Sequence, residues 1–342
     1  MDSIDFTGMT HSLPEQFKEA LEKAKQVDIE VLSGIDFSSI LVLGMGGSGV
    51  SGDIISAVLA PECKIPVNVS KNYELPAFVN SNTLVIAVSY SGTTEETLSA
   101  VEVAQQKSAP MIVVCSGGAL AQIAKDSKSP CVRYSAPDSL QPRAGMGALL
   151  TPIMVALDKL GLYERGISDC ESAIKQLTKR RDECIDPNSQ NIATHLVEKI
   201  ANTIPLIYGG GALGAAAAYR FKCDINENAK TPAYWHAYPE LNHNEIVGFG
   251  QNGDLTRQIL TLIELRHDFE HKQVQRRFEI SRELIRETLH DIIEVRAQGE
   301  TPLAQLCDLT YIGSLSSVYM ALKAGVDPGP VDIIWELKNA LA

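Results

Sequence analysis

The apolar positions along the chain predict an alternation of buried strands and helices. Short β-branched runs alternate with longer helix-like segments, as expected for a parallel sheet whose strands are joined by helices. We predict strands at Ile40–Leu43, Val67–Val69, Leu84–Val88, Met111–Cys115, Leu206–Tyr208, Ile259–Ile263 and Ile292–Val295. We predict helices at Leu13–Leu32, Glu95–Gln106, Gly147–Leu160, Ile174–Cys184 and Lys272–Leu289. The predicted fold class is therefore α/β.

The same order of predicted elements occurs in both halves of the chain. The segment ILVLGMGGSGVSGDI at 40–54 matches PLIYGGGALGAAAAY at 205–219, each an apolar strand, a glycine-rich turn and a helix of small residues. Residues 111–124 pair with 292–307 in the same way, and 148–162 with 314–328. This ordered agreement predicts a duplication. We expect two doubly wound domains, at residues 1–160 and 195–342, joined by a helical connection at 161–194.

Composition narrows the class of protein. The chain has 342 residues and seven cysteines, none in a CxxC pair, which is typical of reduced thiols in a cytoplasmic protein. Its apolar runs are shorter than the roughly 18 residues that cross a bilayer, and its polar N-terminus is unlike a targeting peptide. A formal charge of −12 predicts no nucleic-acid partner. An anionic ligand would have to be held by local N–H groups, hydroxyls and a few cations.

The first glycine-rich turn has the spacing of a dinucleotide-binding loop. Gly44, Gly46 and Gly49 fit GxGxxG, but the next strand leads into Val67-Asn-Val-Ser-Lys-Asn72 without the acidic residue that would bind a ribose. The chain also lacks a GxxxxGK[ST] motif for a nucleoside triphosphate. These features argue against a nicotinamide-dependent dehydrogenase, although that function stays an alternative.

The segment Ser89-Tyr-Ser-Gly-Thr-Thr94 follows a purely apolar strand and is rich in hydroxyls. Phosphate oxygens accept hydrogen bonds from several directions, and the N-terminus of a helix offers free N–H groups and a positive dipole end. Thr93 and Glu96 have capping-box spacing, so a helix is expected to begin here. Helix capping alone would explain one hydroxyl of the four, and we therefore predict a phosphate-binding loop.

At these residues the chain resembles a known family. Ser89, Ser91, Gly92, Thr94, Glu96 and Thr97 match the S-x-S-G-x-T-x-E-T signature of sugar isomerase (SIS) domains. Further motifs follow in order: Gln141-Pro-Arg143-Ala, Arg220-Phe-Lys-Cys-Asp-Ile-Asn-Glu227-Asn-Ala-Lys230, Glu240-Leu-Asn-His243-Asn-Glu and Val326-Asp-Pro-Gly-Pro…Glu336-Leu-Lys338. From about residue 40 onward the chain resembles the bifunctional phosphoglucose/phosphomannose isomerase family, a two-SIS-domain branch of the phosphoglucose isomerase superfamily.

The resemblance implies an aldose–ketose isomerase of glycolysis and gluconeogenesis. It implies that glucose 6-phosphate, and mannose 6-phosphate as well, is interconverted with fructose 6-phosphate through an enediol, without a cofactor or a metal. Glu227 would move the proton, Arg143 would stabilise the enediolate, and His243 and Lys338 would assist ring opening. The phosphate would lie among Gly47, Ser48, Ser89, Ser91 and Thr94. The family also implies a cytoplasmic homodimer in which His243 comes from the neighbouring subunit.

Gly329 departs from the family pattern. Relatives often carry a threonine between the two prolines of the last motif, and that threonine is associated with the mannose 6-phosphate activity. The ratio of the two activities therefore stays open.

The residue types suit this chemistry. A carboxylate can accept and return one proton, an arginine stays charged beside a developing oxyanion, and a histidine titrates in the range needed for ring opening. Each residue also has an ordinary interpretation: Glu227 as a surface acid, His243 as a loop histidine, Lys338 as a helix-end lysine and Arg143 as a surface ion-pair partner.

Other functions stay open. The chain could be another SIS-domain phosphosugar isomerase or a non-catalytic phosphosugar-binding regulator. A zinc enzyme could use His267 and His271, four residues apart, or the cluster of His236, Glu240 and His243, although neither has HExxH spacing. The second glycine-rich stretch, Gly209–Ala218, carries no hydroxyl, so we interpret it as a packing element and expect one phosphate site per chain.

Overall fold

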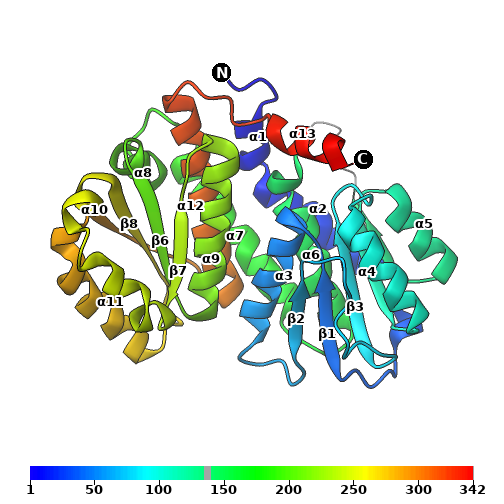
Figure 1. The fold of residues 1–342 in the computed structure, drawn as a ribbon. Coiled ribbons are helices and arrows are strands. Elements are labelled where there is room, and N and C mark those ends of the chain that lie inside the picture. The colour runs from blue at the N-terminus through cyan, green and yellow to red at the C-terminus, as the bar shows by residue number, and fades with distance from the viewer. Residues whose placement is uncertain (135–139, 342) are drawn as a thin grey trace. The chain divides into compact units, whose positions relative to one another are not determined.

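The computed structural model describes residues 1–134 and 140–341, which form two compact units (Figure 1). The N-terminal unit contains residues 12–178 and 299–305, and the C-terminal unit contains 1–11, 179–298 and 306–342. The first eleven residues thus belong with the second half of the chain. The division falls inside helix α7 (Gly166–Cys184), which lies within the segment 161–194 that the sequence analysis assigned to a helical connection.

The N-terminal unit is built on one parallel five-stranded sheet in the order β2-β1-β3-β4-β5. The strands are β1 (Ser39–Leu43), β2 (Val67–Ser70), β3 (Thr83–Ser89), β4 (Met111–Cys115) and β5 (Cys131–Arg133). The three central strands are buried along their whole length, which explains their continuous apolar sequences. The helices are α2 (Leu13–Gln26), α3 (Gly46–Leu59), α4 (Glu95–Gln106), α5 (Gly118–Ser127) and α6 (Met146–Lys159).

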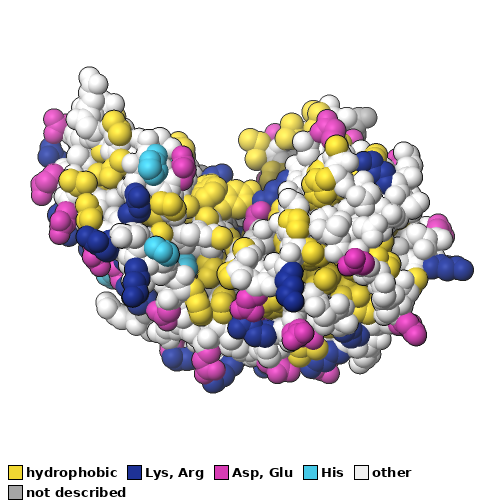
Figure 2. Space-filling model, turned by 90° about the horizontal axis from the view of Figure 1, so that it is seen from below, with side chains coloured by type: hydrophobic (Ala, Val, Ile, Leu, Met, Phe, Trp, Pro, Cys, Tyr) yellow, Lys and Arg dark blue, Asp and Glu magenta, His cyan; other side chains and the backbone are white. Residues whose placement is uncertain are grey.

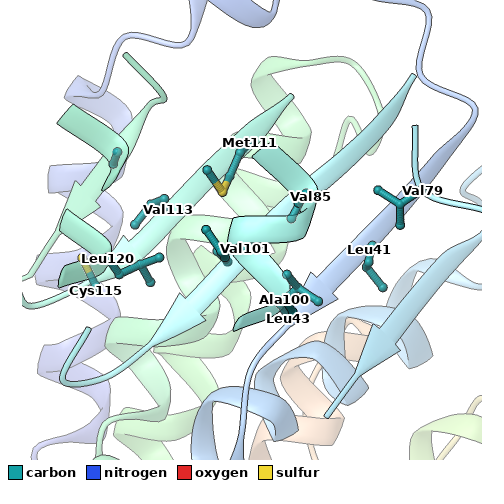
Figure 3. Close-up of a cluster of buried hydrophobic side chains, with 13 residues drawn as sticks. Leu41, Leu43, Val79, Val85, Ala100, Val101, Met111, Val113, Cys115 and Leu120 are labelled. Carbon is teal, nitrogen blue, oxygen red and sulfur yellow. The ribbon is translucent and has the colours of Figure 1, made fainter. Parts of the chain in front are cut away.

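Helices cover both faces of this sheet. Side chains from β1, β3 and β4 pack against α4 and α5 in one cluster of thirteen buried residues, which includes Val85, Val101, Val113 and Leu120 (Figure 3). On the other face α6 contacts β3 and β4 and packs against α2 and α3. The loops that follow β1 and β3 therefore emerge together at the carboxyl edge of the sheet, where doubly wound folds bind their ligands.

The C-terminal unit contains a parallel four-stranded sheet in the order β7-β6-β8-β9. Its strands are β6 (Ile204–Gly210), β7 (Tyr234–Tyr238), β8 (Leu260–Arg266) and β9 (Asp291–Arg296). Its helices are α1 (Phe6–His11), α8 (Ile192–Ile200), α9 (Gly211–Asp224), α10 (Gly253–Ile259), α11 (Lys272–Ile285), α12 (Pro302–Lys323) and α13 (Asp332–Leu341). Helix α12 begins in a segment of the N-terminal unit.

The two sheets share one strand order, in agreement with the predicted duplication. Strands β6, β7, β8 and β9 occupy the places that β1, β2, β3 and β4 occupy in the first sheet. Each of the seven predicted strands exists, and the sequence missed β5 and β7. Strand β5 has three residues, and β7 reads YWHAY with its first two residues exposed, so neither gives the apolar run of a buried strand.

Two predicted helices are shorter than expected. Helix α2 ends at Gln26, and Glu30–Leu32 forms a separate 3₁₀ turn. Helix α11 ends at Ile285, and Arg286–Thr288 forms another such turn. In each case the apolar spacing continues beyond the point where the backbone leaves the α-helix, so periodicity alone could not place the end.

A buried ion pair joins α7 to α12 inside the C-terminal unit. Arg180 contacts Asp308 through two parallel hydrogen bonds of 2.8 and 3.0 Å, and both side chains are almost fully buried. The backbone N–H of Gln298 donates a third bond to the same carboxylate, at 2.8 Å. Arg180 also donates to Glu183 at 2.8 Å, but the Glu183 side chain is 40% exposed, so Asp308 is the buried partner of the guanidinium.

Asp308→Ala should destabilise the C-terminal unit by up to about 3–5 kcal/mol, because it removes the buried partner of the Arg180 guanidinium and leaves only the more exposed Glu183. The free energy of unfolding is measured by urea denaturation. The double variant Arg180→Met, Asp308→Leu should recover most of the loss, since an apolar pair replaces both charges. The exposed ion-pair residue Lys175 gives the matched control, and Lys175→Ala should change little. An Asp308→Ala protein as stable as Lys175→Ala would contradict this account.

Candidate active site

The first glycine-rich loop connects β1 to α3 and is shaped by close contacts. Gly46 has a φ of +51°, a left-handed conformation that glycine adopts without strain. A side chain on Gly47 would meet the Pro142 carbonyl oxygen at 2.9 Å. Ser48 is buried, and its Oγ accepts a 3.2 Å hydrogen bond from the backbone N–H of Tyr90. The loop is thereby tied to the segment after β3.

The hydroxyl-rich loop follows β3 at the same edge of the sheet. Ser89 Oγ lies 2.8 Å from Thr94 Oγ1 and accepts a 3.0 Å hydrogen bond from the Gly92 N–H. Ser91 Oγ lies 2.9 Å from Thr93 Oγ1. Ser89 is buried, Thr94 is half-buried, and Ser91 and Thr93 are exposed. In each pair one hydroxyl donates to the other, and the accepting hydroxyl keeps its own hydrogen to donate outward to an anion.

The N-terminus of α4 differs from the predicted capping box. The N-cap residue is Thr94, not Thr93, and its side chain makes no capping hydrogen bond. Its hydroxyl contacts Ser89 instead. The N–H groups of the first turn are therefore not used by the cap, and a helix of twelve residues directs its positive dipole end toward the loop. This arrangement suits an anion better than a closed cap would.

Arg143 comes to the same loops from the N-terminus of α6. It lies in the short turn Pro142–Ala144, and its side chain is 5% exposed, so it is not the surface ion-pair residue of the ordinary interpretation. Its Cα would lie 3.4 Å from a Cβ added to Gly47. Within the N-terminal unit the structure therefore places Arg143 beside Gly47, in the loop that Ser48 ties to Tyr90, while Ser91 stands at the exposed end of the hydroxyl-rich loop.

Glu227 lies in the C-terminal unit, in the single π-helical turn Ile225–Ala229 that continues α9. Such turns occur frequently at functional sites. Around it Asn228 donates to Ser317 Oγ at 2.9 Å, and the Lys230 ammonium donates to the Glu227 carbonyl oxygen at 2.7 Å. The Glu227 side chain is half-buried, unlike that of a freely exposed surface acid.

His243 stands exposed on a 3₁₀ turn, Glu240–His243. The preceding residue is held firmly: Asn242 donates to Ser281 Oγ at 2.7 Å and accepts from the Arg277 guanidinium at 3.0 Å. In the part of the chain that the structure describes, no hydrogen bond to the His243 ring is recorded. The ordinary interpretation, a histidine bonded to nearby backbone, therefore finds no support.

Lys338 projects from α13, a helix with no buried residue. Its ammonium lies 5.5 Å from the centre of the Trp335 ring, a cation–π contact. Gly329, just before this helix, faces the N-terminus of the chain: a side chain there would meet Ile4 Cγ1 at 2.5 Å. Ile4 thus occupies the space that a larger side chain at this position would need.

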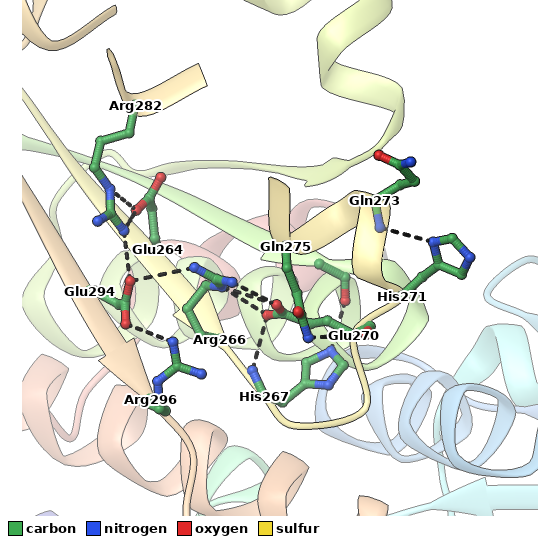
Figure 4. A network of polar contacts seen from close by, with 11 residues as sticks. Glu264, Arg266, His267, Glu270, His271, Gln273, Gln275, Arg282, Glu294 and Arg296 are labelled. Carbon is green, nitrogen blue, oxygen red and sulfur yellow. Dashed lines mark hydrogen bonds and ion pairs between the residues drawn. The ribbon is translucent and has the colours of Figure 1, made fainter. Parts of the chain in front are cut away.

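The carboxyl edge of the second sheet is filled by charged side chains (Figure 4). Arg266, at the end of β8, contacts Glu270 through hydrogen bonds of 2.9–3.1 Å. Arg282 donates to Glu264 and Glu294, each at 2.7 Å, and Arg296 donates to Glu294 at 2.9 Å. Three arginines and three glutamates balance one another, so this edge offers no net positive charge to a phosphate.

The second glycine-rich turn is a packing element, as predicted. A Cβ on Gly209 would lie 2.0 Å from the Gly214 carbonyl oxygen, so β6 and α9 approach each other at a distance that glycine alone allows. The neighbouring Gly210 carbonyl oxygen lies 2.9 Å from the His267 Nε2 atom. A Cβ on Gly210 would lie 3.3 Å from Glu270 Cγ, so this turn also adjoins the Arg266–Glu270 pair. The expectation of one phosphate site per chain stays a prediction.

Three of the four histidines considered as metal ligands have other partners. The buried His267 ring forms a hydrogen-bond contact with the Gly210 carbonyl oxygen. Burial lowers the pKa of His267. His271 accepts a 3.1 Å hydrogen bond from the Gln273 N–H at the start of α11. His236 lies 3.9 Å from Glu245. Within residues 1–134 and 140–341, no group of three His, Cys, Asp or Glu side chains is arranged to hold a metal ion.

The sequence analysis assigned no individual role to three residues near these groups. The Thr97 hydroxyl, in the first turn of α4, and the Tyr90 hydroxyl are buried without a partner among the described residues. Arg220 forms a buried ion pair with Asp224 at 2.8 Å; burial opposes its charge, but Asp224 and then Glu227 raise its pKa. The signal for Arg220 was present, because seven residues, two helical turns, separate it from Glu227.

The surface carries charged side chains of both signs. On the face seen in Figure 2, acidic and basic side chains are interspersed, and the net charge of the chain is −12. None of the described helices combines the length and the apolar character needed to cross a membrane.

Comparisons with known proteins agree with the duplicated fold. Residues 35–130 match the SIS domain, and residues 189–341 match the bacterial phospho-glucose isomerase C-terminal SIS domain. Among solved structures, a putative phosphosugar isomerase from Silicibacter pomeroyi superposes with a TM-score of 0.73 over 96% of this chain and all of its own, at 14% identity. This likeness shows the fold.

Sequence relatives extend over nearly the whole chain. A bifunctional phosphoglucose/phosphomannose isomerase from Caldicellulosiruptor bescii is 38% identical over 97% of each protein. A protein of the same description from Aquifex aeolicus is 32% identical over 89% of this chain and 91% of its own. Together with the two SIS domains, these relatives show that the chain belongs to the bifunctional phosphoglucose/phosphomannose isomerase family.

Proposed function

We propose that the protein interconverts glucose 6-phosphate, and mannose 6-phosphate as well, with fructose 6-phosphate by moving one proton between C1 and C2. The observation that carries the proposal is the hydroxyl-lined loop at the uncapped N-terminus of α4, which has the donors and the dipole of an anion site. The family of the chain supports the choice of a phosphosugar as that anion.

The phosphate would be held mostly by uncharged donors. Ser48, Ser89, Ser91 and Thr94, with the backbone at Gly47, surround the edge where β1 and β3 end. A phosphate monoester carries close to two negative charges, and charge-assisted hydrogen bonds to it are stronger than neutral ones. Binding the charged end of the sugar this way fixes the distance from the phosphate to the reacting carbons.

Glu227 would act as the base. A carboxylate can take the proton from one carbon of the sugar and return it to the neighbouring carbon. The π-helical turn and the Asn228–Ser317 hydrogen bond hold the backbone on either side of it. Arg220, two turns earlier, interacts electrostatically with this carboxylate, and Asp224 followed by Glu227 raises the pKa of Arg220.

Arg143 would stabilise the enediolate. Negative charge develops on the sugar oxygens as the proton leaves carbon, and a fixed guanidinium lowers the energy of that state. Its burial beside Gly47 restricts its motion. His243 and Lys338 would transfer protons during ring opening and closure. Neither step requires a redox cofactor or a metal.

We further propose a cytoplasmic homodimer in which His243 serves the neighbouring subunit's site. The exposed position of His243 on a rigid turn supports this, because a residue that acts in its own unit would be expected to face inward. Such an enzyme would take part in glycolysis and gluconeogenesis. A phosphosugar-binding regulator would bind the same ligand without turning it over, so turnover separates these functions.

Glu227→Gln should lower kcat at least about 100-fold, because the amide keeps the shape of the carboxylate but cannot accept the proton. Conversion of glucose 6-phosphate or mannose 6-phosphate to fructose 6-phosphate is measured with and without EDTA, and chelation should have no effect. Fructose 6-phosphate should still bind to the variant in calorimetry. Glu279→Gln, the same change on an exposed site of α11, is the control. Unchanged turnover in Glu227→Gln would refute the mechanism, and loss of wild-type activity in EDTA would indicate a metal enzyme.

Thr94→Val should raise KM for fructose 6-phosphate about tenfold with a smaller effect on kcat, since it removes one hydrogen bond to a charged group. The inhibition constant of inorganic phosphate should rise by a similar factor. Thr93→Val is the matched control in the same loop, because Thr93 faces Ser91 at the exposed end. Equal effects of the two substitutions would contradict the assigned position of the phosphate.

Mixing the inactive variants Glu227→Gln and His243→Asn should restore activity if His243 acts across the dimer. After subunit exchange, half of the dimers are mixed, and each mixed dimer has one site with both native residues, so about a quarter of the wild-type activity is expected. Each variant alone, treated identically, is the control. A mixture no more active than its components would show that both residues act within one chain.

A further inference from the structure

Two cysteines lie side by side in neighbouring strands of the N-terminal sheet. Cys115 is the last residue of β4 and Cys131 the first of β5, and their sulfur atoms are 4.0 Å apart. The strand register pairs Val113 with Cys131, so the two thiols project from the same face of the sheet, two residues out of register. Figure 3 shows Cys115 beside Leu120 at one end of the buried cluster.

The two thiols have different environments. Cys115 is fully buried, whereas Cys131 is partly exposed. The hydrogen bond between them and burial raise the pKa of Cys115, while the same hydrogen bond, together with the nearby Arg133, lowers the pKa of Cys131. Cys131 is therefore the thiol that ionises first, and it is also the one that a small reagent can reach.

This pair adjoins the hydroxyl-rich loop. In the sheet register Cys115 stands opposite Ser89. The next residue, Ser116, donates to the Tyr90 carbonyl oxygen through its N–H and its hydroxyl, at 3.1 and 2.8 Å. A Cβ on Gly92 would lie 1.9 Å from the Gly117 carbonyl oxygen, so the loop has no free space on this side.

Strand β5 also contacts the loop. The Arg133 guanidinium donates to the Ser116 carbonyl oxygen at 3.3 Å, and the Tyr134 hydroxyl donates to the Tyr90 carbonyl oxygen at 2.7 Å. A shift of β5 along the sheet would therefore disturb the residues on either side of Tyr90. Strand β5 is the element free to move, because it is a three-residue edge strand paired on one side only.

We propose that Cys115 and Cys131 form a reversible disulfide in the presence of hydroperoxides, and that its closure weakens phosphate binding at the adjoining loop. The second half rests on the proposed function of that loop. The bond would bring the sulfur atoms to about 2 Å. For strands about 4.8 Å apart, Cα atoms two residues out of register lie about 8 Å apart, beyond the usual span of a disulfide. Closure must therefore move the backbone.

The chemistry balances with a hydroperoxide as the oxidant. The Cys131 thiolate attacks the terminal peroxide oxygen, the O–O bond breaks, and an alcohol leaves after taking up a proton, so that Cys131 becomes a sulfenic acid. The Cys115 sulfur then attacks the Cys131 sulfur and releases water, which carries away the thiol proton. Two thiols lose two electrons in total, and one peroxide gains them. A dithiol reductant reverses the process.

The first test is chemical. The reduced protein is treated with tert-butyl hydroperoxide, free thiols are blocked, and tryptic peptides are analysed by mass spectrometry. Cleavage after Lys107, Lys125, Lys128 and Arg133 places the two cysteines on peptides 108–125 and 129–133. We expect a cross-linked peptide pair that disappears on treatment with dithiothreitol. Its absence from a protein that remains folded by circular dichroism would overturn the proposal.

The second test measures binding of inorganic phosphate and of fructose 6-phosphate by calorimetry in the reduced, oxidised and re-reduced protein. Oxidation should weaken both affinities about fivefold or more, the loss of one or two hydrogen bonds, and re-reduction should restore them. Cys131→Ser and Cys131→Ala should bind like the reduced wild type before and after peroxide. Cys63→Ser, a partly exposed cysteine of the same unit, should respond as the wild type does.

The outcomes separate the two proposals. A cross-link that leaves phosphate affinity unchanged overturns the coupling to the loop. A weakened affinity that also occurs in Cys131→Ser assigns the effect to another site and overturns the role of this pair. A protein that forms the cross-link but binds no phosphosugar even when reduced overturns the proposed function, while the disulfide itself stands.

Discussion

The close packing of backbone at the carboxyl edge of the first sheet is the constraint on which the candidate site depends. Gly92 lies against Gly117, and Gly47 lies against the Pro142 carbonyl, at distances that exclude any side chain. Ser48 is fixed by the Tyr90 N–H and Ser89 by Thr94. With the loops pressed together in this way, their hydroxyls keep fixed positions and the N-terminus of α4 stays uncapped. Preorganised donors of this kind bind an anion without first having to be ordered.

The two sheets have the same topology but carry different side chains at their carboxyl edges. Both have the strand order 2-1-3-4, and both begin with a strand, a glycine turn and a helix of small residues. In the first, the loop after the third strand carries hydroxyls and no charge. In the second, the corresponding strand ends in Arg266, whose guanidinium is neutralised by Glu270. A phosphate at that edge would meet the Glu270 carboxylate, which disfavours an anion there.

The second unit contributes different groups. Its long helix α9 ends in the π-helical turn of Glu227, supported by the buried Arg220–Asp224 pair and by Ser314, which donates to Asp224 at 2.5 Å. Buried and mutually compensated charges hold this helix end in place, and they leave Glu227 near a positive charge. We therefore propose that the N-terminal unit binds the anion and that the C-terminal unit supplies the residue that transfers the proton.

Sequence and tertiary structure decided different things about this protein. The fold class, the seven main strands, the duplication and the family followed from the sequence, because buried strands need continuous apolar runs and the loop motifs are local in the chain. The sequence also named the hydroxyls, Arg143 and Glu227. It could not find the edge strands β5 and β7, or the ends of α2 and α11. Nor could it show that Thr94 leaves the helix uncapped, that Ile4 fills the space beside Gly329, or that Cys115 meets Cys131. Each of these depends on contacts between residues distant in the sequence or on backbone geometry at an element's end, which no local pattern encodes.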